Sequence, residues 1–312
     1  MKLFLIALLI LTLAMAYSPI NKEIVEEIKR KTDLWTPVEP EDNVFRDRDE
    51  DEISSFLGTK IEDEKKSDSS DKDMGMKEDD DFNDHHGSLP THFDARTEWG
   101  DICQFRINDQ GKCGSCWAFG AVEILEDRIC IKSKGNFTKN LSEQHLVSCI
   151  WGKKGCIGGN PVTAFGYLMF RGIPTEECKP YYSGETKDPG KCSNDCLDPD
   201  MDNKKYKCKS PWTGFRSKTI KKEIKKNGPV MTVMLVYEDL MNYGKGIYHH
   251  VAGRPMGGHA VKIIGWGKQD DHKYWIAANS WSEEWGENGY FRIKEGDSFA
   301  GKAAFACKPY KY

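Results

Sequence analysis

The stretch Gln110–Trp117, QGKCGSCW, decides the interpretation of this 312-residue sequence. Two short motifs far downstream complete it: Gly258-His259-Ala260 and Asn279-Ser280-Trp281. The second cysteine of the stretch, the histidine and the asparagine thus supply a thiol, an imidazole and an amide, in that order. A thiol nucleophile assisted by an imidazole, whose orientation a third group fixes, is a recurring arrangement for nucleophilic catalysis.

Cys116 is the candidate nucleophile, and it must ionise in order to act. A free thiol has a pKa of about 8.5, which a helix N-terminus and a neighbouring imidazolium both lower. Residues 116–131 carry apolar side chains close to helical spacing, so Cys116 would open a helix. His259 would supply the imidazolium if the fold brings it near, and would then protonate a leaving amine as general acid. The sequence therefore favours thiol-dependent cleavage of an amide bond.

Other interpretations of these residues remain open at this point. Cys113-x-x-Cys116 alone is compatible with a thioredoxin-like redox pair or with half of a zinc site. Neither a βαβ pattern nor a second ligand pair at zinc spacing accompanies it, so we expect no metal and no cofactor. A lone histidine is more often structural, but His259 lies between Gly257-Gly258 and a hydrophobic strand, which favours a function. We expect His85-His86 and His249-His250 to be solvated loop residues.

From Leu89 onward, the sequence resembles the cathepsin B branch of the papain-like cysteine proteases, and the likeness covers residues 89–312. The shared motifs are LPTHFDAR at 89–96, GAVE at 120–123, DRIC at 127–130, KNGPV at 226–230, GGHA at 257–260, GWG at 265–267 and ANSW at 278–281. The family implies an α+β, papain-like fold with a helical left lobe and an antiparallel β right lobe. The active-site cleft would lie between the lobes, with Cys116 and His259 on opposite walls. The predicted strands are Val230–Tyr237, Ala260–Gly265, Tyr274–Ala278 and Tyr290–Ile293.

The resemblance also assigns roles to individual residues. Gln110 would donate its side-chain amide to the oxyanion, together with the backbone N–H of Cys116. Asn279 would fix the orientation of the His259 ring, and Trp281 would shield that hydrogen bond and face the substrate. These roles imply a cysteine endopeptidase that hydrolyses peptide bonds in protein and peptide substrates.

The N-terminal third of the chain has a different composition. Residues 1–16 have the pattern of a secretory signal peptide. Residues 17–88 carry 11 basic and 23 acidic side chains, a net charge of −12, whereas residues 89–312 carry 33 and 26, a net charge of +7. We interpret 17–88 as an acidic propeptide, with a short helix over Asn21–Lys31, that inhibits the mature 89–312 domain; the alternative is a solvated acidic tail. Acid would protonate its carboxylates and weaken its attachment.

The signal peptide indicates the secretory pathway, with the lysosome, an endosomal vacuole or the extracellular space as destination. The sequence contains no nucleic-acid motif and no apolar run long enough to span a membrane. The sequons at Asn136 and Asn140 predict glycosylation or, with equal weight, an unmodified surface loop. The family adds cystatin-like inhibitors to the expected partners, and we expect a monomer.

Eleven cysteines are an odd number, which in a secreted protein indicates one free thiol. If Cys116 is the nucleophile, the other ten can pair. The resemblance implies the pairs Cys103–Cys130, Cys113–Cys156, Cys149–Cys192 and Cys178–Cys196. Cys208 and Cys307 lack family counterparts, and we pair them by elimination.

Two departures from cathepsin B determine the expected specificity. Mammalian cathepsin B has an occluding loop with paired histidines, whereas Tyr182–Lys191 here is short and contains no histidine. We therefore predict endopeptidase activity through an open cleft. Phe305 stands where cathepsin B has a glutamate at the base of S2, so we expect Leu, Val or Phe at P2. Gly158 and Gly159 would line the S2–S3 edge, after Ile157 in place of the usual asparagine.

Two alternatives to an endopeptidase remain. The first is a non-catalytic binding protein with a papain fold, which the intact candidate catalytic residues disfavour. The second is an exopeptidase, which would need an added segment that closes one end of the cleft.

Overall fold

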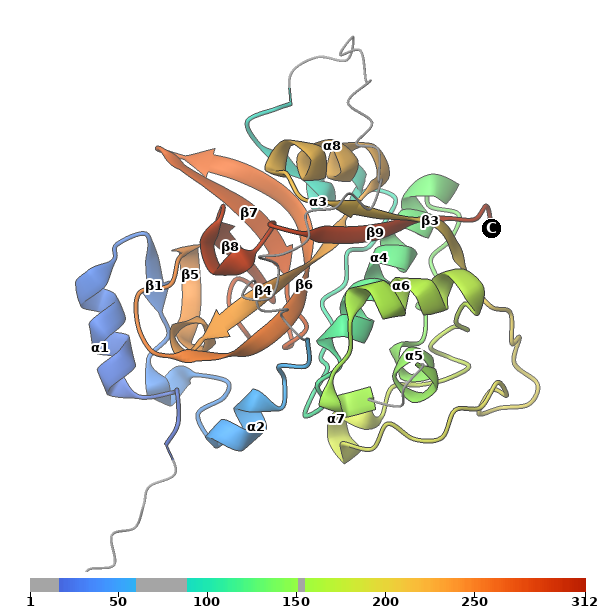
Figure 1. Cartoon of the computed structure of the whole chain (residues 1–312), viewed down its shortest axis with the longest axis horizontal. Coiled ribbons are helices and arrows are strands. Elements are labelled where there is room, and N and C mark those ends of the chain that lie inside the picture. The colour runs from blue at the N-terminus through green and yellow to red at the C-terminus, as the bar shows by residue number, and fades with distance from the viewer. Residues whose placement is uncertain (1–16, 60–88, 151–154) are drawn as a thin grey trace, which may run out of the picture.

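The computed structural model describes residues 17–59, 89–150 and 155–312. The predicted signal peptide, the acidic stretch 60–88 and His85-His86 lie outside the described residues. Helices α4 to α7, within residues 116–186, lie mostly on one side of the molecule, and most strands lie on the other side (Figure 1). This arrangement agrees with the predicted α+β fold.

The longest helix, α4 (Cys116–Ser133), forms the centre of the helical lobe. Its residues 116–130 are buried, and it ends where Lys134 adopts a left-handed conformation with φ of 55°. The helix predicted over 116–131 is therefore confirmed. The other helices of this lobe are α5 (Glu143–Cys149), α6 (Pro161–Phe170) and α7 (Ser183–Thr186). Because α4 is enclosed on all sides, its first residue has a fixed position in the molecule.

Within the described residues, nine strands form one sheet in the order β1-β5-β8-β7-β6-β4-β9-β3, and β2 pairs with β6. The strands are β1 (Trp35–Pro37), β2 (Phe93–Asp94), β3 (Cys208–Gly214), β4 (Val230–Tyr237), β5 (Tyr243–Tyr248), β6 (Pro255–Gln269), β7 (His272–Ala278), β8 (Tyr290–Lys294) and β9 (Ala304–Pro309). All pairs are antiparallel except β5 with β8. The prediction for β4 is confirmed at both ends, whereas β6 is longer than predicted. Helices α3 (Ala95–Trp99) and α8 (Ser217–Asn227) accompany the sheet.

Buried ion pairs join α4 to the sheet. Lys262 Nζ, on β6, lies 3.1 Å from Glu123 Oε2 and 3.0 Å from Asp127 Oδ2. Arg128 donates to Glu223 Oε1 on α8 and to the carbonyl of Pro229, each over 2.8 Å. Removing one partner of a buried pair leaves an uncompensated charge and is strongly destabilising. These contacts therefore join the middle of α4 to β6 and to α8.

Residues 17–59, here called the N-terminal segment, lie along one side of the sheet (blue in Figure 1). Helix α1 (Lys22–Lys31) confirms the predicted short helix and buries Ile24, Val25 and Ile28. Strand β1 extends the sheet by pairing with β5, and α2 (Glu50–Ser54) follows near the boundary between the lobes. The segment is thus packed against the body and is not a solvated tail.

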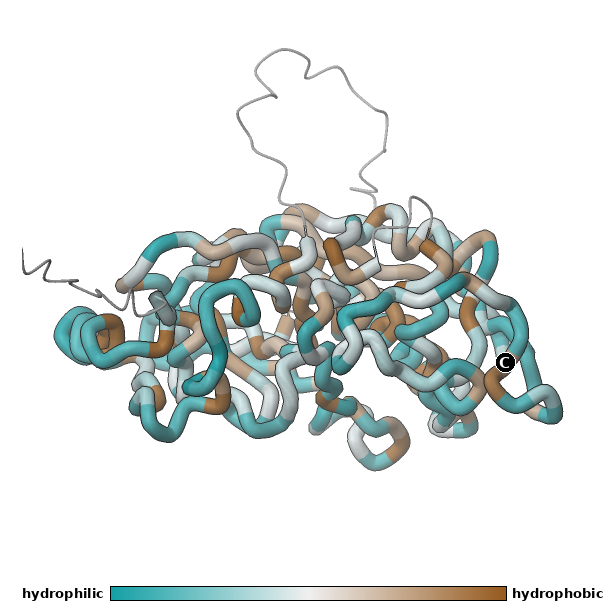
Figure 2. The backbone as a smooth tube through the Cα atoms, turned by 90° about the horizontal axis from the view of Figure 1, so that it is seen from below, coloured by the Kyte–Doolittle hydropathy of each residue, from teal (hydrophilic) through white to brown (hydrophobic). Residues whose placement is uncertain are grey.

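The described residues contain five disulfides. Four are the pairs that the resemblance implied: Cys103–Cys130, Cys113–Cys156, Cys149–Cys192 and Cys178–Cys196. The fifth, Cys208–Cys307, is the pair predicted by elimination. In the described part of the chain, Cys116 is the free cysteine. Hydrophilic residues predominate along the outer edges of the body (Figure 2). Among the helices of the described residues, none combines the length and the apolar character that crossing a membrane requires.

One expectation about a loop needs correction. The His250 ring is only partly exposed: it stacks on Tyr237 with ring centroids 3.6 Å apart, and its Nδ1 lies 3.1 Å from Asp239 Oδ2. Asp239 is fully buried and accepts further bonds from the Tyr248 hydroxyl and from two backbone N–H groups. This carboxylate therefore draws the histidine into a packed loop.

Candidate active site

Cys116 is the first residue of α4 and is fully buried. Its Sγ lies 3.2 Å from the Thr59 hydroxyl of the N-terminal segment. Burial alone raises the pKa of this thiol, but the charge of His259 and hydrogen bonds from His259 and Thr59 outweigh it and lower the pKa to about 7. The thiol is thus poised to ionise near neutral pH.

The His259 ring is oriented by Asn279. His259 lies on β6 opposite Met234 of β4, and its Nε2 is 2.8 Å from Asn279 Oδ1. The same Oδ1 accepts from the backbone N–H of Ser280 over 2.8 Å, which identifies it as the oxygen of the amide. His259 must therefore donate from Nε2. Nδ1 is then the ring nitrogen that remains for the Cys116 thiol.

Trp281 covers this histidine. The two rings stack with centroids 4.7 Å apart and planes 28° apart, and Trp281 is itself buried. Phe45 and Phe56 of the N-terminal segment also pack against the Trp281 indole, with ring centroids 5.8 and 6.3 Å from it. Water is therefore kept from the bond between His259 and Asn279.

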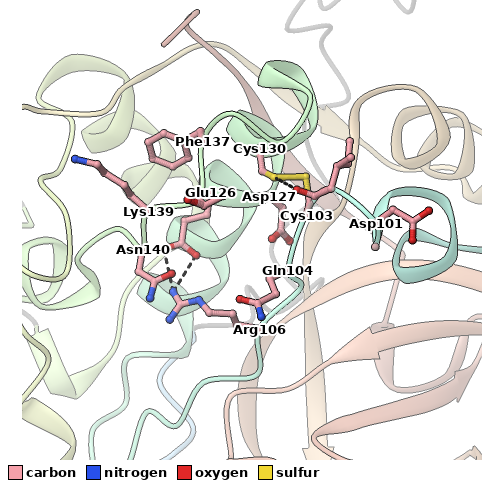
Figure 3. Close-up of a pocket in the computed structure, with 13 residues that line it drawn as sticks. Asp101, Cys103, Gln104, Arg106, Glu126, Asp127, Cys130, Phe137, Lys139 and Asn140 are labelled. Carbon is pink, nitrogen blue, oxygen red and sulfur yellow. Dashed lines mark hydrogen bonds and ion pairs between the residues drawn. A yellow bond between two sulfur atoms is a disulfide. The ribbon is translucent and has the colours of Figure 1, made fainter.

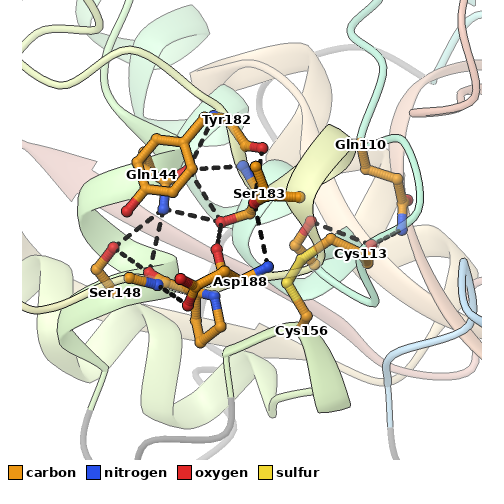
Figure 4. Close-up of a disulfide and its surroundings, with 12 residues drawn as sticks. Gln110, Cys113, Gln144, Ser148, Cys156, Tyr182, Ser183 and Asp188 are labelled. Atoms are coloured by element: carbon orange, nitrogen blue, oxygen red, sulfur yellow. Dashed lines mark hydrogen bonds between the residues drawn. A yellow bond between two sulfur atoms is a disulfide. The ribbon is translucent and has the colours of Figure 1, made fainter.

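The Gln110 side chain is held by the right lobe. Ser280 Oγ donates to Gln110 Oε1 over 2.6 Å, and the Gln110 N–H donates to the Ser280 carbonyl over 2.9 Å. Two carbonyl oxygens, which can only accept, lie at the other end of the amide and identify that end as the NH₂ group. Nε2 then donates to the carbonyls of Phe56 and Cys113, each over 2.8 Å (the latter visible in Figure 4). An amide donor next to Cys116 thus already binds a peptide carbonyl.

The N-terminal segment passes through the site between its two walls. Gly159 N–H donates to the Gly58 carbonyl over 2.7 Å, and Thr59 N–H donates to the Gly258 carbonyl over 3.0 Å. Gly158 has φ of 123°, and a Cβ there would meet the Gly58 carbonyl. Only glycine adopts that backbone freely. The two glycines of the left wall therefore let an extended chain approach closely.

Contacts farther out hold the same segment. The Trp35 indole packs on Tyr243 and Tyr248 of β5 and donates to the His249 carbonyl over 3.1 Å. Glu52 of α2 forms a 2.5 Å ion pair with Lys112, two residues after Gln110. The segment is therefore attached on both sides of the catalytic thiol.

The structure brings most of the predicted site residues together, but not all of them. The residues that lie around Phe56–Thr59 are the candidate catalytic and cleft residues Cys116, His259, Asn279, Gln110, Trp281, Gly158 and Gly159. Phe305 lies on β9 opposite Met231 of β4, and its contact with the cleft stays a prediction. Asn136 and Asn140 are both exposed. Ser280, which orients Gln110, was missed as a positioning residue because its role depends on a contact between lobes.

A separate cavity of about 250 Å³ lies beside the Cys103–Cys130 disulfide, and its lining includes none of the candidate catalytic residues (Figure 3). Its polar lining includes Arg106 and Glu126, which are 3.1 Å apart. Burial raises the pKa of Glu126 to about 7, although Arg106 acts against that change. In the described ranges, no group of three or more His, Cys, Asp or Glu side chains is arranged to hold a metal ion.

Comparisons with known proteins agree with this geometry. Residues 89–309 match the papain family cysteine protease domain. The chain is 39% identical over 251 residues to cathepsin B-like cysteine proteinase 1 of Ostertagia ostertagi, covering 72% of this chain and 74% of the relative. It is 40% identical over 235 residues to a gut-specific cysteine proteinase of Caenorhabditis elegans, covering 69% and 71%.

Solved structures give the same result. Procathepsin B S9 from Trypanosoma congolense superposes with a TM-score of 0.82 at 30% identity, covering 94% of this chain and all of the other. Procathepsin L 3 from the Tenebrio molitor larval midgut shares the fold, with a TM-score of 0.68, 21% identity and coverage of 92% and 86%. The chain therefore belongs to the papain family of cysteine proteases and is similar to its cathepsin B-like members.

Proposed function

We propose that the protein is a cysteine endopeptidase, made as a zymogen, in which Cys116 is the nucleophile. The observation that carries this proposal is the lowered pKa of Cys116 beside a histidine whose Nε2 is bound by Asn279. The thiolate attacks the carbonyl carbon of the scissile bond, and His259 gives its Nδ1 proton to the leaving amine. Asn279 and Trp281 keep the ring in that orientation through both steps.

Gln110 stabilises the oxyanion of the tetrahedral intermediate. Its Nε2 already donates to a peptide carbonyl, that of Phe56, and so lies where it could bind the carbonyl oxygen of a substrate. The Cys116 backbone N–H, at the free amino end of α4, is the second donor. Loss of one such donor typically lowers kcat by about 10² to 10³.

The N-terminal segment inhibits the enzyme because it lies in the site in a non-productive arrangement. The carbonyl that Gln110 binds belongs to Phe56, whereas the residue in contact with Cys116 Sγ is Thr59. Cleavage needs one peptide to present its carbon to the thiolate and its oxygen to the amide donor. No single peptide in Phe56–Thr59 satisfies both contacts, so the segment occupies the cleft and is not cut there.

The primed side of the cleft is open in the mature enzyme. Ser183 and Gly184, in the segment that replaces an occluding loop, are buried, and Gly184 accepts from the Lys112 N–H over 2.8 Å. Gln144 holds Ser183 through both ends of its amide (Figure 4). These contacts support a segment that packs against the left lobe, where peptides could extend past it.

The S2 subsite accepts apolar side chains. Opposite residues of an antiparallel pair point to the same face, so Phe305 shares a face with Met231, and Met231 with Lys262. Met231 lies against Gly120 of α4, and Lys262 pairs with Glu123 of α4. This face therefore looks toward the boundary between the lobes, which supports Phe305 as part of the S2 wall.

The remaining parts of the proposal concern location and partners. Five disulfides suit the secretory pathway, leading to a lysosome, a vacuole or the extracellular space. Protein and peptide substrates, the protein's own N-terminal segment and cystatin-like inhibitors are the expected partners of a monomeric enzyme.

The test is an internally quenched peptide library incubated with acid-treated protein, with cleavage positions read by mass spectrometry. Internal cleavage with Leu, Val or Phe at P2 is expected, and Cys116→Ala should abolish it. Faster release of C-terminal dipeptides than internal cleavage would contradict an open primed side. No Cys116-dependent cleavage would leave a binding protein as the better interpretation.

A further inference from the structure

We propose that Tyr181 is a positioning residue for the oxyanion hole, because its hydroxyl joins the two chain segments that supply the donors. This inference rests on the proposed role of Gln110. Tyr181 lies in the left lobe, outside the motifs that carry the catalytic residues. Its ring is half-buried, and its hydroxyl points at Gln110 and at the residue before Cys116.

The hydrogen bonds of this hydroxyl have a fixed direction. Tyr181 Oη donates to the Gln110 backbone carbonyl over 2.8 Å, and Ser115 Oγ lies 2.9 Å from the same Oη. A hydroxyl carries one hydrogen, so Ser115 is the donor of the second bond. Ser115 directly precedes Cys116, whose backbone N–H is the other oxyanion donor. One hydroxyl thus links both halves of the oxyanion hole.

Gln110 is held from the right lobe at its backbone N–H and at Oε1, while its Nε2 donates to the Phe56 and Cys113 carbonyls. Ser280 binds its N–H over 2.9 Å and its Oε1 over 2.6 Å. The Tyr181 contact with its carbonyl is the corresponding restraint from the left lobe. Because donors aimed at a transition state lose effect when they move by fractions of an ångström, this restraint bears on kcat.

Tyr181 is itself well anchored. Its ring meets Phe119 of α4 edge-on, with centroids 4.9 Å apart. The next two residues donate their N–H groups to Gln144 Oε1, over 3.0 Å from Tyr182 and 3.1 Å from Ser183 (Figure 4). Burial raises the pKa of Tyr181, although the Ser115 bond acts against this, so the hydroxyl stays protonated and can donate. The hydroxyl is therefore a rigid donor.

The test compares Tyr181→Phe with the wild type in the activated enzyme. We expect kcat to fall about tenfold with KM within about twofold, because the lost bond acts on groups used in the transition state. Affinity for a peptide aldehyde, whose hemithioacetal needs the oxyanion hole, should fall by a similar factor. The pH profile of iodoacetamide alkylation, which reports the Cys116–His259 pair, should not change.

A double-mutant cycle separates positioning from a structural effect. In a Gln110→Ala background, adding Tyr181→Phe should lower kcat no further, because the donor that it positions is absent. The matched control is Tyr182→Phe, at the neighbouring exposed tyrosine, which should leave kcat and aldehyde affinity unchanged.

Three outcomes would overturn the inference: unchanged kcat and aldehyde affinity in Tyr181→Phe, an equal loss in the Gln110→Ala background, or alkylation slowed as much as kcat. If Tyr181→Phe does not fold, Ser115→Ala serves instead, since it removes one bond of the same hydroxyl. Ser115→Ala should then lower kcat and aldehyde affinity together, and an unchanged kcat would refute the proposal. If Gln110→Ala alone leaves kcat unchanged, the proposed role of Gln110 fails.

Discussion

At Cys116, burial and charge act on the thiol pKa in opposite directions. Burial raises it, whereas His259 and the Thr59 hydroxyl lower it, and the result is a pKa of about 7. Part of this burial comes from the N-terminal segment, since Thr59 lies against Sγ. When that segment leaves, the thiol regains solvent while His259 remains. The pKa in the processed enzyme should therefore fall below about 7.

The first prediction concerns this change. Iodoacetamide should alkylate Cys116 of the processed enzyme well below pH 7, and should react far more slowly with the zymogen, where Sγ is covered. The measurement is the alkylation rate as a function of pH. The control is His259→Ala, which should return the thiol pKa toward about 8.5. Alkylation of the processed enzyme only above pH 8 would contradict the interpretation.

The second prediction concerns Phe305. Phe305→Glu should raise kcat/KM for substrates with arginine at P2 by about tenfold relative to phenylalanine, because a partly buried carboxylate would pair with the guanidinium. Kinetics on two peptides that differ only at P2 measure this ratio. The control is Val162→Glu, a new carboxylate on an exposed residue of α6. An unchanged ratio in Phe305→Glu would place Phe305 outside S2.

At this scale the sequence predicts which residues of the candidate site lie together, but not the residues that support them. Cys116, His259 and Asn279 lie in short motifs whose chemistry follows from residue type. Ser280 and Tyr181 are ordinary hydroxyl residues until the fold places them against Gln110. No local pattern indicates a hydrogen bond between residues 71 apart, as Tyr181 and Gln110 are.

Among the secondary-structure elements, α2 has the clearest electrostatic link to the active-site wall. Its Glu52 accepts from Lys112 Nζ, and this hydrogen bond lowers the pKa of Glu52. A lowered carboxylate pKa means that the contact contributes to attachment above the ordinary pKa of glutamate. That contribution is lost as the pH falls through the lowered pKa.

The third prediction follows from this pH dependence of the contact between Glu52 and Lys112. Glu52→Gln should speed activation of the zymogen about twofold to fivefold near pH 6.5, since a partly exposed ion pair contributes little. Below the lowered pKa of Glu52 the two proteins should activate at equal rates, because the wild-type carboxyl is then protonated and no longer pairs with Lys112. Gel densitometry of the processed product gives the rates.

The matched control for this prediction is Asp51→Asn, which removes an exposed carboxylate of the same helix without touching the pair. Equal activation of wild type and Glu52→Gln at both pH values would mean that α2 is held by its apolar contacts. If wild-type zymogen activated equally fast at pH 4.5 and pH 7.5, the proposal that acid weakens the attachment of the N-terminal segment would be wrong.

Strands were predicted where apolar residues dominate, as in β4, and missed where they do not. β3 contains Pro211 and exposes three consecutive residues, so its sequence lacks the alternation that indicates a strand. It forms because β9 pairs with it and because Cys208 is joined to Cys307. The packing of His250 was not predicted because Asp239, which binds it, belongs to a different turn.

For the molecule as a whole, the Cys208–Cys307 disulfide closes the longest loop, with a sequence separation of 99 residues. The fourth prediction is that Cys208→Ser with Cys307→Ser lowers the free energy of unfolding by about 2–4 kcal/mol, mainly by releasing chain entropy in the unfolded state. For a domain of this size, Tm should fall by about 5–15 °C.

Calorimetry of the processed enzyme measures that change. Peptide mapping under non-reducing conditions is the control, and it should recover the two cysteines in one linked peptide. Either cysteine alkylated without prior reduction would refute the pairing itself.

The position of Thr59 over Cys116 has a consequence for the oxidation chemistry of the chain. Disulfides form in an oxidising compartment, and there a thiol with a pKa near 7 would be the most reactive sulfur to oxidants and mixed disulfides. Cys116 is fully buried while the N-terminal segment is attached. The attached segment therefore covers this sulfur, so that ten cysteines can oxidise while the eleventh stays reduced.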